Sequence, residues 1–389
     1  MILAVLNLML GISGAKRMDF DDIKTPFYLL KEQKLRKNLE ILDQVQKRSG
    51  AKILLALKGF AFSGAFDLIR EYLMGCCASG LHEARYSHEM LGLETHTYSP
   101  AFKDSEFDEI VSISNHIVFN SFSQWQKFKN KAVGKVSCGL RINPEVSASP
   151  TDLYNPCAAY SRLGITKKEF RDDLIDGIEG LHFHALCEQG ANELEMVLDG
   201  FEKNFSYLLP KMKWVNFGGG HHITKDGYDV DKLIYLIKEF KDRYGVDIYL
   251  EPGEAVGWES GVLVSEVLDI VHNEIDIAIL DISAEAHMPD TIIMPYRANI
   301  KGADKPNIKR YNYRITGNSC LAGDIMGDYS FDTPLKVGDR VIFEDQIHYT
   351  IVKNTTFNGV KLPDLVVEKE DGSYKVVKEF GYEEYKRRN

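Results

Sequence analysis

The chain has 389 residues, of which 44% are hydrophobic and 27% are charged. These values are ordinary for a globular protein, and the length allows two or three domains with ample core. The formal net charge of -10 disfavours nucleic acid as a partner and favours cationic ligands.

The first residues are unlike the rest of the chain. Met1 to Ala15 is apolar, with no basic residue before the apolar run. The stretch is too short to span a bilayer and lacks the positive region of a secretion signal, so no membrane partner is expected. We interpret residues 1–17 as an upstream extension, with translation starting at Met18 and residues 1–23 preceding the first domain. Six cysteines without zinc-site spacing predict a reduced, cytoplasmic setting.

The next elements follow a regular alternation. A strand is predicted over Thr25–Leu30, and leucines at helical spacing predict a helix over Lys34–Val45. From residue 52 onward, short apolar runs alternate with amphipathic segments. The eight predicted strands are Ile53–Leu57, Gly75–Ala78, His96–Tyr98, His116–Phe119, Ser137–Ile142, Ile178–Ala185, Lys213–Phe217 and Asp247–Leu250. The helices expected between them are Ala65–Leu73, His82–Leu91, Glu106–Ile113, Gln124–Ala132, Glu169–Ile175, Glu195–Leu209 and Val230–Arg243.

Strands that alternate with helices predict a parallel α/β sheet, and eight of them favour a closed (β/α)8 barrel. An open, doubly wound sheet is the alternative. After Gly261 the pattern changes to short strands with turn residues between them, which indicates a mostly β domain. We therefore predict a barrel over residues 24–262 and a C-terminal β domain over 263–389, with Thr25–Leu30 joining the β domain. The β-domain strands are expected at Val262–Val264, Ile277–Leu280, Tyr313–Ile315, Arg340–Phe343, Tyr349–Val352 and Tyr374–Val377.

Lys58 stands at the carboxyl end of the first barrel strand, where barrel chemistry gathers. An ammonium that loses water there has a lowered pKa, and its amine becomes nucleophilic enough to attack a carbonyl. The alternative is a lysine that extends to solvent along its apolar stem.

Three other strand ends carry groups that suit a flat, phosphorylated cofactor. The turn Gly218-Gly219-Gly220 can offer backbone amides to a phosphate, although a plain turn is the alternative. His182 and His184 share one strand face and can stack on a ring; a core histidine is the alternative, and we expect no metal. Glu251 needs a partner if buried, and either a protonated pyridine nitrogen or a basic side chain would serve. With Lys58, these groups predict pyridoxal 5'-phosphate (PLP).

The chain resembles the barrel-fold, PLP-dependent amino-acid decarboxylases, which include the ornithine, arginine and diaminopimelate enzymes. It is most similar to their carboxynorspermidine/carboxyspermidine decarboxylase branch, which belongs to polyamine (spermidine) biosynthesis. The motifs that carry the family resemblance are Ala56-Leu57-Lys58, Phe183-His184, Gly218-Gly219-Gly220, Glu251-Pro252-Gly253, Asp281, Asn318-Ser319-Cys320 with Asp324, Tyr349, and Phe357-Asn358-Gly359. The features that carry the resemblance to this branch are Glu254, Ala286–Asp290, Met294–Arg297 and the Cys320–Asp324 spacing.

The resemblance implies a role for each matching residue. Lys58 would hold PLP covalently, His184 would stack on its ring, Gly218–Gly220 and Tyr349 would bind its phosphate, and Glu251 would pair with its ring nitrogen.

The resemblance also implies roles at the substrate end. Cys320 and Asp324 would reach into the site of a partner subunit, so a homodimer is expected, and Cys320 would return a proton after CO2 leaves. Asp281 and Asp324 would face the distal amines of a polyamine-type substrate, and Glu254 is assigned to substrate binding as well.

The sequence departs from the wider family in three places. Ornithine-type enzymes have an arginine in place of Glu254 and a phosphate-binding serine in place of Cys187, and diaminopimelate decarboxylases have a glutamate in place of Leu321. A diaminopimelate- or ornithine-type decarboxylase or an amino-acid racemase on the same fold is the first alternative. A non-enzymatic PLP-binding barrel is the second, although such proteins typically lack the β domain.

Overall fold

The computed structural model describes residues 18–389 apart from 147 and 150–151. The extension expected over residues 1–17 lies outside this part of the chain. None of the described helices combines the length and the apolar character that crossing a membrane requires.

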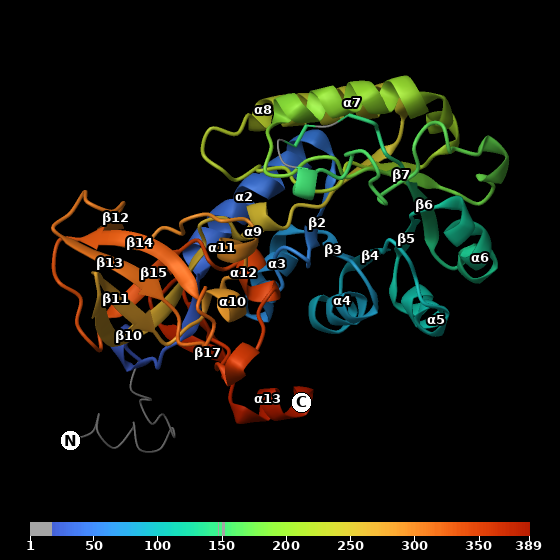
Figure 1. Cartoon of the computed structure of the whole chain (residues 1–389). Helices are drawn as coiled ribbons and strands as arrows, with labels where there is room; N and C mark the ends of the chain where they lie inside the picture. Colours follow the sequence, from blue (N-terminus) through green and yellow to red (C-terminus); the bar gives the residue numbers. More distant parts are fainter. Residues whose placement is uncertain (1–17, 147, 150–151) are drawn as a thin grey trace, which may run out of the picture.

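Eight parallel strands close into a barrel in the order β2 to β9 (Figure 1). The circle is completed between the first and last of them, where Lys52 and Ile53 pair with Tyr249 and Leu250. Closure confirms the predicted barrel and excludes the doubly wound sheet. All eight predicted strands are confirmed, with the bounds β2 Lys52–Ala56, β3 Gly75–Ala78, β4 Glu94–Tyr98, β5 His116–Phe119, β6 Ser137–Arg141, β7 Gly180–His182, β8 Trp214–Asn216 and β9 Asp247–Leu250.

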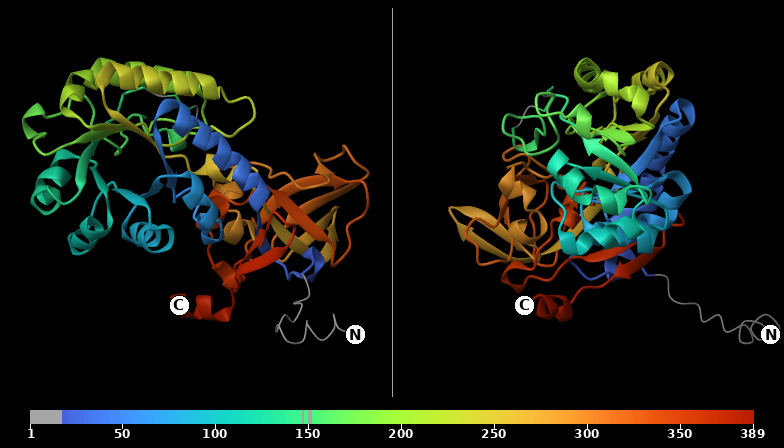
Figure 2. Two further views of the ribbon diagram at one scale, coloured as in Figure 1. Left: turned by 180° about the vertical axis from the view of Figure 1, so that it is seen from behind. Right: turned by 90° about the vertical axis from the view of Figure 1, so that its right-hand side faces the viewer.

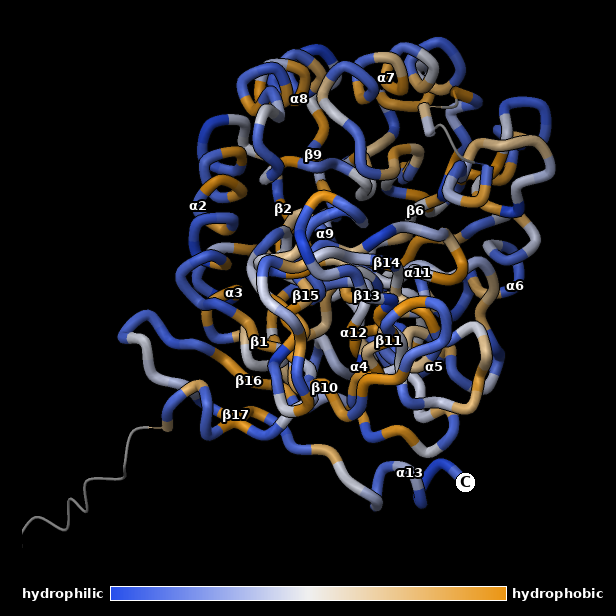
Figure 3. Tube along the Cα trace, turned by 60° about the vertical axis from the view of Figure 1, so that its left-hand side comes forward, coloured by the Kyte–Doolittle hydropathy of each residue, from blue (hydrophilic) through white to orange (hydrophobic). Residues whose placement is uncertain are grey.

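Helices cover the outside of the barrel (Figures 1 and 2). In α2 the residues Leu35, Leu39, Leu42 and Val45 are fully buried, and Figure 3 shows hydrophobic and hydrophilic positions alternating along this helix. That stripe is what an amphipathic helix needs to pack on a sheet. The helices are α2 Glu32–Ser49, α3 Phe66–Tyr72, α4 Leu81–Tyr86, α5 Asp104–Ile113, α6 Phe122–Ala132, α7 Ala191–Phe205 and α8 Val230–Tyr244.

The helix expected at Glu169–Ile175 is wrong. The structure has only a 3-10 turn there, over Asp172–Leu174. Phe170, Leu174 and Ile175 pack on the core, but Arg171 to Asp173 between them are exposed, so the segment lacks a continuous apolar face to pack on the barrel. A helix this short is not stable without such packing.

The barrel interior is filled by side chains rather than open. A cluster of Leu54, Val118, Trp214 and Tyr249 occupies it. The indole of Trp214 lies over β7, where a side chain at Gly180 would come within 2.1 Å of the ring. Glycine is therefore required at this position for the aromatic layer to form.

The C-terminal sheet has nine strands, and β1 (Phe27–Lys31) is one of them. β1 pairs antiparallel with β10 and parallel with β16, so an N-terminal strand lies within the C-terminal sheet. The other strands are β10 Gly261–Asn273, β11 Ile275–Leu280, β12 Ala303–Asp304, β13 Tyr311–Thr316, β14 Ile325–Phe331, β15 Arg340–Glu344, β16 Asp364–Glu368 and β17 Tyr374–Lys378. The domain bounds 24–262 and 263–389 stay predictions.

The strand expected at Tyr349–Val352 is wrong, because these residues form the helical turn α12. The Thr350 hydroxyl donates to Oε1 of Gln346 at 2.9 Å, and the Asn354 side chain donates to the Thr350 carbonyl at 2.8 Å. These local bonds outweigh the strand propensity of the β-branched residues. β12, β14 and β16 were not predicted from the sequence.

Candidate active site

Lys58 lies two residues beyond β2, at the mouth of the barrel. Its turn packs on the segment after β9, since the Ala56 amide donates to the Pro252 carbonyl at 2.9 Å. The side chain keeps access to solvent, and among the described residues its amine has no hydrogen bond or ion pair. Although the side chain as a whole is exposed, burial of its amine among the strand ends, together with the nearby Arg141 cation, lowers the pKa of Lys58. A larger fraction of its amine is therefore neutral and nucleophilic.

Glu251 follows β9 and is held by two neighbouring strand ends. Asn216, the last residue of β8, donates to Oε1 at 2.7 Å. Nε2 of His182, the last residue of β7, lies 3.6 Å from Oε2. Burial lowers the pKa of His182 to about 4, although the carboxylate acts in the opposite direction. A neutral His182 does not form an ion pair with Glu251, so the carboxylate can still pair with a protonated ring nitrogen.

The three glycines after β8 do not act alike. The Gly218 amide donates to Oδ1 of Asn216 at 2.8 Å, and the Gly219 amide donates to Nδ1 of His184 at 2.9 Å. Only the Gly220 amide has no hydrogen-bond partner among the described residues. The turn therefore offers one free donor to an anion, whereas its other two amides fix the side chains around it.

His184 is neutral at this position. Burial, followed by the charges of Lys58 and Arg141, lowers its pKa well below the ordinary value. Because Nδ1 accepts from Gly219, the ring proton is on Nε2. The ring is thus fixed beside the glycine turn, which fits a side chain that stacks on a flat cofactor.

Arg141 was not assigned a role from the sequence. It is the last residue of β6 and is 5% exposed. Its guanidinium donates to the His184 carbonyl at 3.3 Å and lies 4.7 Å from the centre of the Tyr98 ring. Asn216 was missed as well, and the signal for both residues was their position at the end of a barrel strand.

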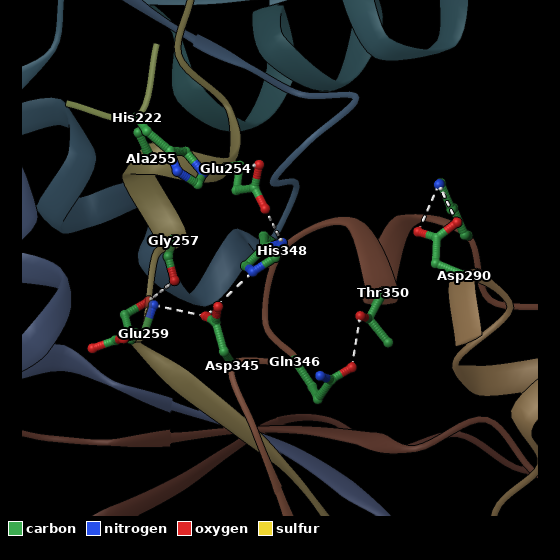
Figure 4. A network of polar contacts seen from close by, with 12 residues as sticks. His222, Glu254, Ala255, Gly257, Glu259, Asp290, Asp345, Gln346, His348 and Thr350 are labelled. Atoms are coloured by element: carbon green, nitrogen blue, oxygen red, sulfur yellow. Dashed lines mark hydrogen bonds and ion pairs between the residues drawn. The ribbon is translucent and has the colours of Figure 1, made fainter. Parts of the chain in front are cut away.

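Tyr349 and Glu254 lie beside the strand-end residues of the candidate site. Burial, followed by the charge of Glu254, raises the pKa of Tyr349, so its hydroxyl stays protonated and can donate to an anion. Glu254 begins the short helix α9 (Glu254–Gly257). Its carboxylate lies 3.3 Å from Nε2 of His222 and 3.7 Å from Nδ1 of His348 (Figure 4).

Two of the three predicted substrate residues, Asp281 and Asp324, form no hydrogen bond or ion pair with this group among the described residues. Asp281 follows β11 and accepts the Glu266 amide at 2.9 Å. Asp324 is 3% exposed, and its carboxylate accepts the amides of Ala284 at 2.6 Å and Ser319 at 3.1 Å. Within one chain, Asp324 therefore organises the Cys320 loop, and its role toward substrate amines stays a prediction.

Cys320 lies on the loop between β13 and β14. It is exposed, and its amide donates to Oδ1 of Asn358 at 2.5 Å. Within the described chain no contact joins Cys320 to Lys58, so a shared site between two subunits stays a prediction.

One group of possible metal ligands lies at the opposite end of the barrel strands. It consists of Glu94, His96 and His116, whose donor atoms lie within 4.8 Å of one another. The two imidazoles stack with centres 3.9 Å apart and planes only 11° from parallel. Since the lone pair of a ring nitrogen lies in the ring plane, both rings cannot bind one ion without rotating.

Comparison with known proteins decides the family. The sequence profile described as "Pyridoxal-dependent decarboxylase, C-terminal sheet domain" matches residues 27–346. The chain belongs to the pyridoxal-dependent decarboxylase family. The match confirms the resemblance that the strand-end motifs carry.

Two curated relatives of this decarboxylase cover nearly its whole length. A carboxynorspermidine/carboxyspermidine decarboxylase of Campylobacter jejuni is 56% identical over 383 residues, which cover 96% of this chain and 100% of the relative. A carboxyaminopropylagmatine decarboxylase of Synechocystis is 44% identical over 94% of this chain and 95% of the relative.

Solved structures share the fold of the decarboxylase. The carboxynorspermidine decarboxylase of Campylobacter jejuni complexed with norspermidine superposes with a TM-score of 0.89 at 55% identity, over 94% of this chain and 100% of that one. A diaminopimelate decarboxylase of Helicobacter pylori superposes with a TM-score of 0.80 at 18% identity, over 95% and 97% of the two chains. At that identity the second match shows the fold alone.

Proposed function

We propose that this decarboxylase removes CO2 from carboxynorspermidine and carboxyspermidine, giving norspermidine and spermidine, with PLP held at Lys58. The observation that carries the proposal is the full-length, 56% match to a decarboxylase named for these two substrates. The strand-end group of Lys58, His184 and Glu251 supports the same chemistry.

The residues at the barrel mouth fit PLP. The unpaired amine of Lys58 suits attachment to an aldehyde, the Gly220 amide and the Tyr349 hydroxyl suit a phosphate, and Glu251 suits a protonated pyridine nitrogen. When bound, PLP supplies an electron sink for the charge left by the departing carboxylate.

The chain's own residues orient this chemistry. Asn216 keeps the Glu251 carboxylate in one position, so that the charge of Glu251 stabilises a proton on the ring nitrogen. Gly219 fixes the neutral ring of His184 against the cofactor face. Cys320, supplied by the second subunit of a homodimer, holds the proton that replaces the carboxyl group. Asp281 and Asp324 stay our assignments for the amines of the substrate, whereas the position of Glu254 between two histidines favours a role at the phosphate end over its predicted role toward the substrate.

Two alternatives are weaker. The β domain and the Cys320 loop favour a decarboxylase over a small PLP-binding barrel. The 44% match to a carboxyaminopropylagmatine decarboxylase favours a guanidino-substituted substrate as the second candidate. The two carboxy-triamines differ by one methylene, which a pocket separates by only ~1–3 kcal/mol, so we propose that both are used.

The test is turnover by the wild-type chain and by Lys58→Ala. We expect wild type to release CO2 from both carboxy-triamines, with the matching triamine found by mass spectrometry, and to show the visible absorbance of attached cofactor. Lys58→Ala should lose both signals. Lys52→Ala changes the lysine at the other end of β2 and should keep both. Turnover by Lys58→Ala at the wild-type rate would contradict the proposal.

A further inference from the structure

Two histidines and two carboxylates form a cluster between the barrel and the β domain (Figure 4). His222 follows β8 and Glu254 begins α9, whereas Asp345 and His348 precede α12. Glu254 lies 3.3 Å from His222 and 3.7 Å from His348, and Nε2 of His348 lies 3.2 Å from Oδ1 of Asp345. Asp345 also accepts the Glu259 amide at 2.7 Å. Glu254 is thus held between two imidazoles.

This cluster lies beside the residues that we assign to the cofactor phosphate, Gly220 and Tyr349. The Glu254 amide lies against the Lys58 turn, where a side chain at Gly59 would come within 3.1 Å of its nitrogen. The charge of Glu254 also raises the pKa of both Tyr349 and Cys187, after burial, which acts more strongly. Cys187 in turn adjoins Gly220, since a side chain at Gly220 would come within 2.9 Å of the Cys187 backbone nitrogen. A carboxylate therefore lies beside the phosphate-binding donors.

The Glu254 charge would repel a phosphate held at Gly220, because like charges repel each other strongly where water is excluded. A proton on an adjacent imidazole would remove the repulsion. His348 faces Glu254, Asp345 and Glu188, and its ring stacks 6.3 Å from that of Trp258. Burial acts to lower the pKa of His348, but Asp345, Glu254 and Glu188 outweigh it and raise the pKa above its ordinary value.

Two neighbouring cationic or titratable groups are less suited to this role. His221 has no hydrogen-bond partner for its ring nitrogens among the described residues, and burial lowers its pKa to about 4. The Lys225 amine lies 5.5 Å from the centre of the Trp258 ring, and among the described residues it has no ion pair with Glu254. His222 lies nearer to Glu254, at 3.3 Å, but His348 also faces a second carboxylate, Asp345, at 3.2 Å, which favours a proton on its ring. We therefore assign the neutralising charge to His348.

We propose that His348 is a positioning residue that neutralises Glu254 so that the Gly220 amide can bind the cofactor phosphate. This inference rests on the proposed function, because it assumes that PLP binds at Lys58. It has a direct consequence: retention of the phosphorylated cofactor weakens as pH rises and His348 loses its proton. The phosphate itself stays a dianion over that range, since its second pKa is about 6.

The experiment measures equilibrium binding of PLP and of pyridoxal, which lacks the phosphate, to the full-length protein freed of cofactor. His348→Gln should weaken PLP binding by roughly tenfold and leave pyridoxal binding unchanged. Adding Glu254→Gln should restore most of the PLP affinity, because the unneutralised carboxylate is gone. Glu254→Gln alone should flatten the pH dependence of PLP binding.

His272→Gln is the matched control. His272 also pairs with a carboxylate, Asp276, at 2.8 Å, but on the exposed β10–β11 hairpin, so neither affinity should change. The inference is overturned if His348→Gln weakens PLP and pyridoxal equally or leaves PLP binding unchanged, or if the double variant binds PLP no better than the single one. Should His348→Gln not fold, an unchanged pH dependence in Glu254→Gln overturns it. Wild-type protein that binds neither probe would instead refute the proposed function.

Discussion

The amide of Gly219 donates a hydrogen bond to Nδ1 of His184 at 2.9 Å. A backbone group that is itself fixed by the strand end thus sets the tautomer and the orientation of the imidazole. A side chain at Gly219 would lie 2.3 Å from the Glu251 carbonyl oxygen and 3.3 Å from Cε1 of His184. The glycine turn, the histidine and the acid are therefore one packed unit.

Gly219→Ala should damage that unit. We expect the free energy of unfolding to fall by about 1–3 kcal/mol, as for other overpacked sites, and PLP binding to weaken because His184 and Glu251 are pushed apart. Urea unfolding of the cofactor-free protein and PLP titration measure the two effects. Gly381→Ala is the control, since nothing lies within 4 Å of a side chain there. Equal free energies of unfolding and equal PLP binding in Gly219→Ala and Gly381→Ala would show that the turn is not closely packed.

Asn216→Ala removes the hydrogen bond to the Glu251 carboxylate. A bond to a charged group contributes about 1.5–3 kcal/mol, whereas a bond between neutral groups contributes about 0.5–1.5 kcal/mol. Asn204→Ala is the comparison, because Asn204 donates a single bond, to the neutral Pro144 carbonyl at 3.3 Å, whereas Asn216 also accepts the Gly218 amide at 2.8 Å. Urea unfolding should show a larger loss for Asn216→Ala. A smaller loss than that of Asn204→Ala would contradict a charged Glu251.

The buried histidines predict acid sensitivity. The pKa of His221 is about 4 in the folded protein, because burial disfavours the cation, and about 6.5 when unfolded. Between these pH values only the unfolded chain binds the proton on His221. The contribution of a neutral His221 to the free energy of unfolding is therefore fully present above pH 6.5 and is lost as the pH drops toward 4. His221→Leu should make this slope shallower by about 1 kcal/mol per pH unit, whereas His88→Leu at an exposed site should not. Unfolding curves at several pH values provide the measurement. An unchanged slope of the free energy of unfolding against pH in His221→Leu would refute this prediction.

The barrel and the cofactor end of the site could be predicted because their signals are local. Each barrel strand is a short apolar run, and Lys58, Gly218–Gly220 and Glu251 each follow one directly in the sequence. Since parallel strands end at one edge, position along the chain translates into position in space. Asn216 and Arg141 occupy equivalent strand ends, but polar residues at such ends are common, so no local feature assigned them a role.

The parts that the sequence analysis missed depend on contacts between distant segments. His348 meets Glu254 only because the turn before α12 packs on the end of the barrel. The strand propensity of Tyr349–Val352 is overridden by bonds from Gln346 and Asn354. Asp324 was assigned to the substrate from the family resemblance, and this role stays a prediction; no local signal indicated that its carboxylate accepts two backbone amides within one chain. No periodicity in the sequence encodes such pairings.

A site shared between two subunits predicts complementation. Lys58→Ala and Cys320→Ala should each be inactive as homodimers. After the two are mixed and allowed to exchange subunits, half of the dimers are mixed and each holds one intact site, so roughly a quarter of wild-type activity should return. Lys58→Ala mixed with itself is the control. Activity that stays at zero in a mixture shown to contain mixed dimers would place Cys320 and Lys58 of the same chain in one site.

The measurement that tests the central claim most directly is kcat/KM for CO2 release on a panel of substrates. The panel is carboxynorspermidine, carboxyspermidine, carboxyaminopropylagmatine, diaminopimelate and ornithine. We predict that the two carboxy-triamines give the highest values and lie within about 200-fold of each other, which is the limit for one methylene. A higher value for diaminopimelate or ornithine, or no CO2 from either carboxy-triamine, would contradict the account.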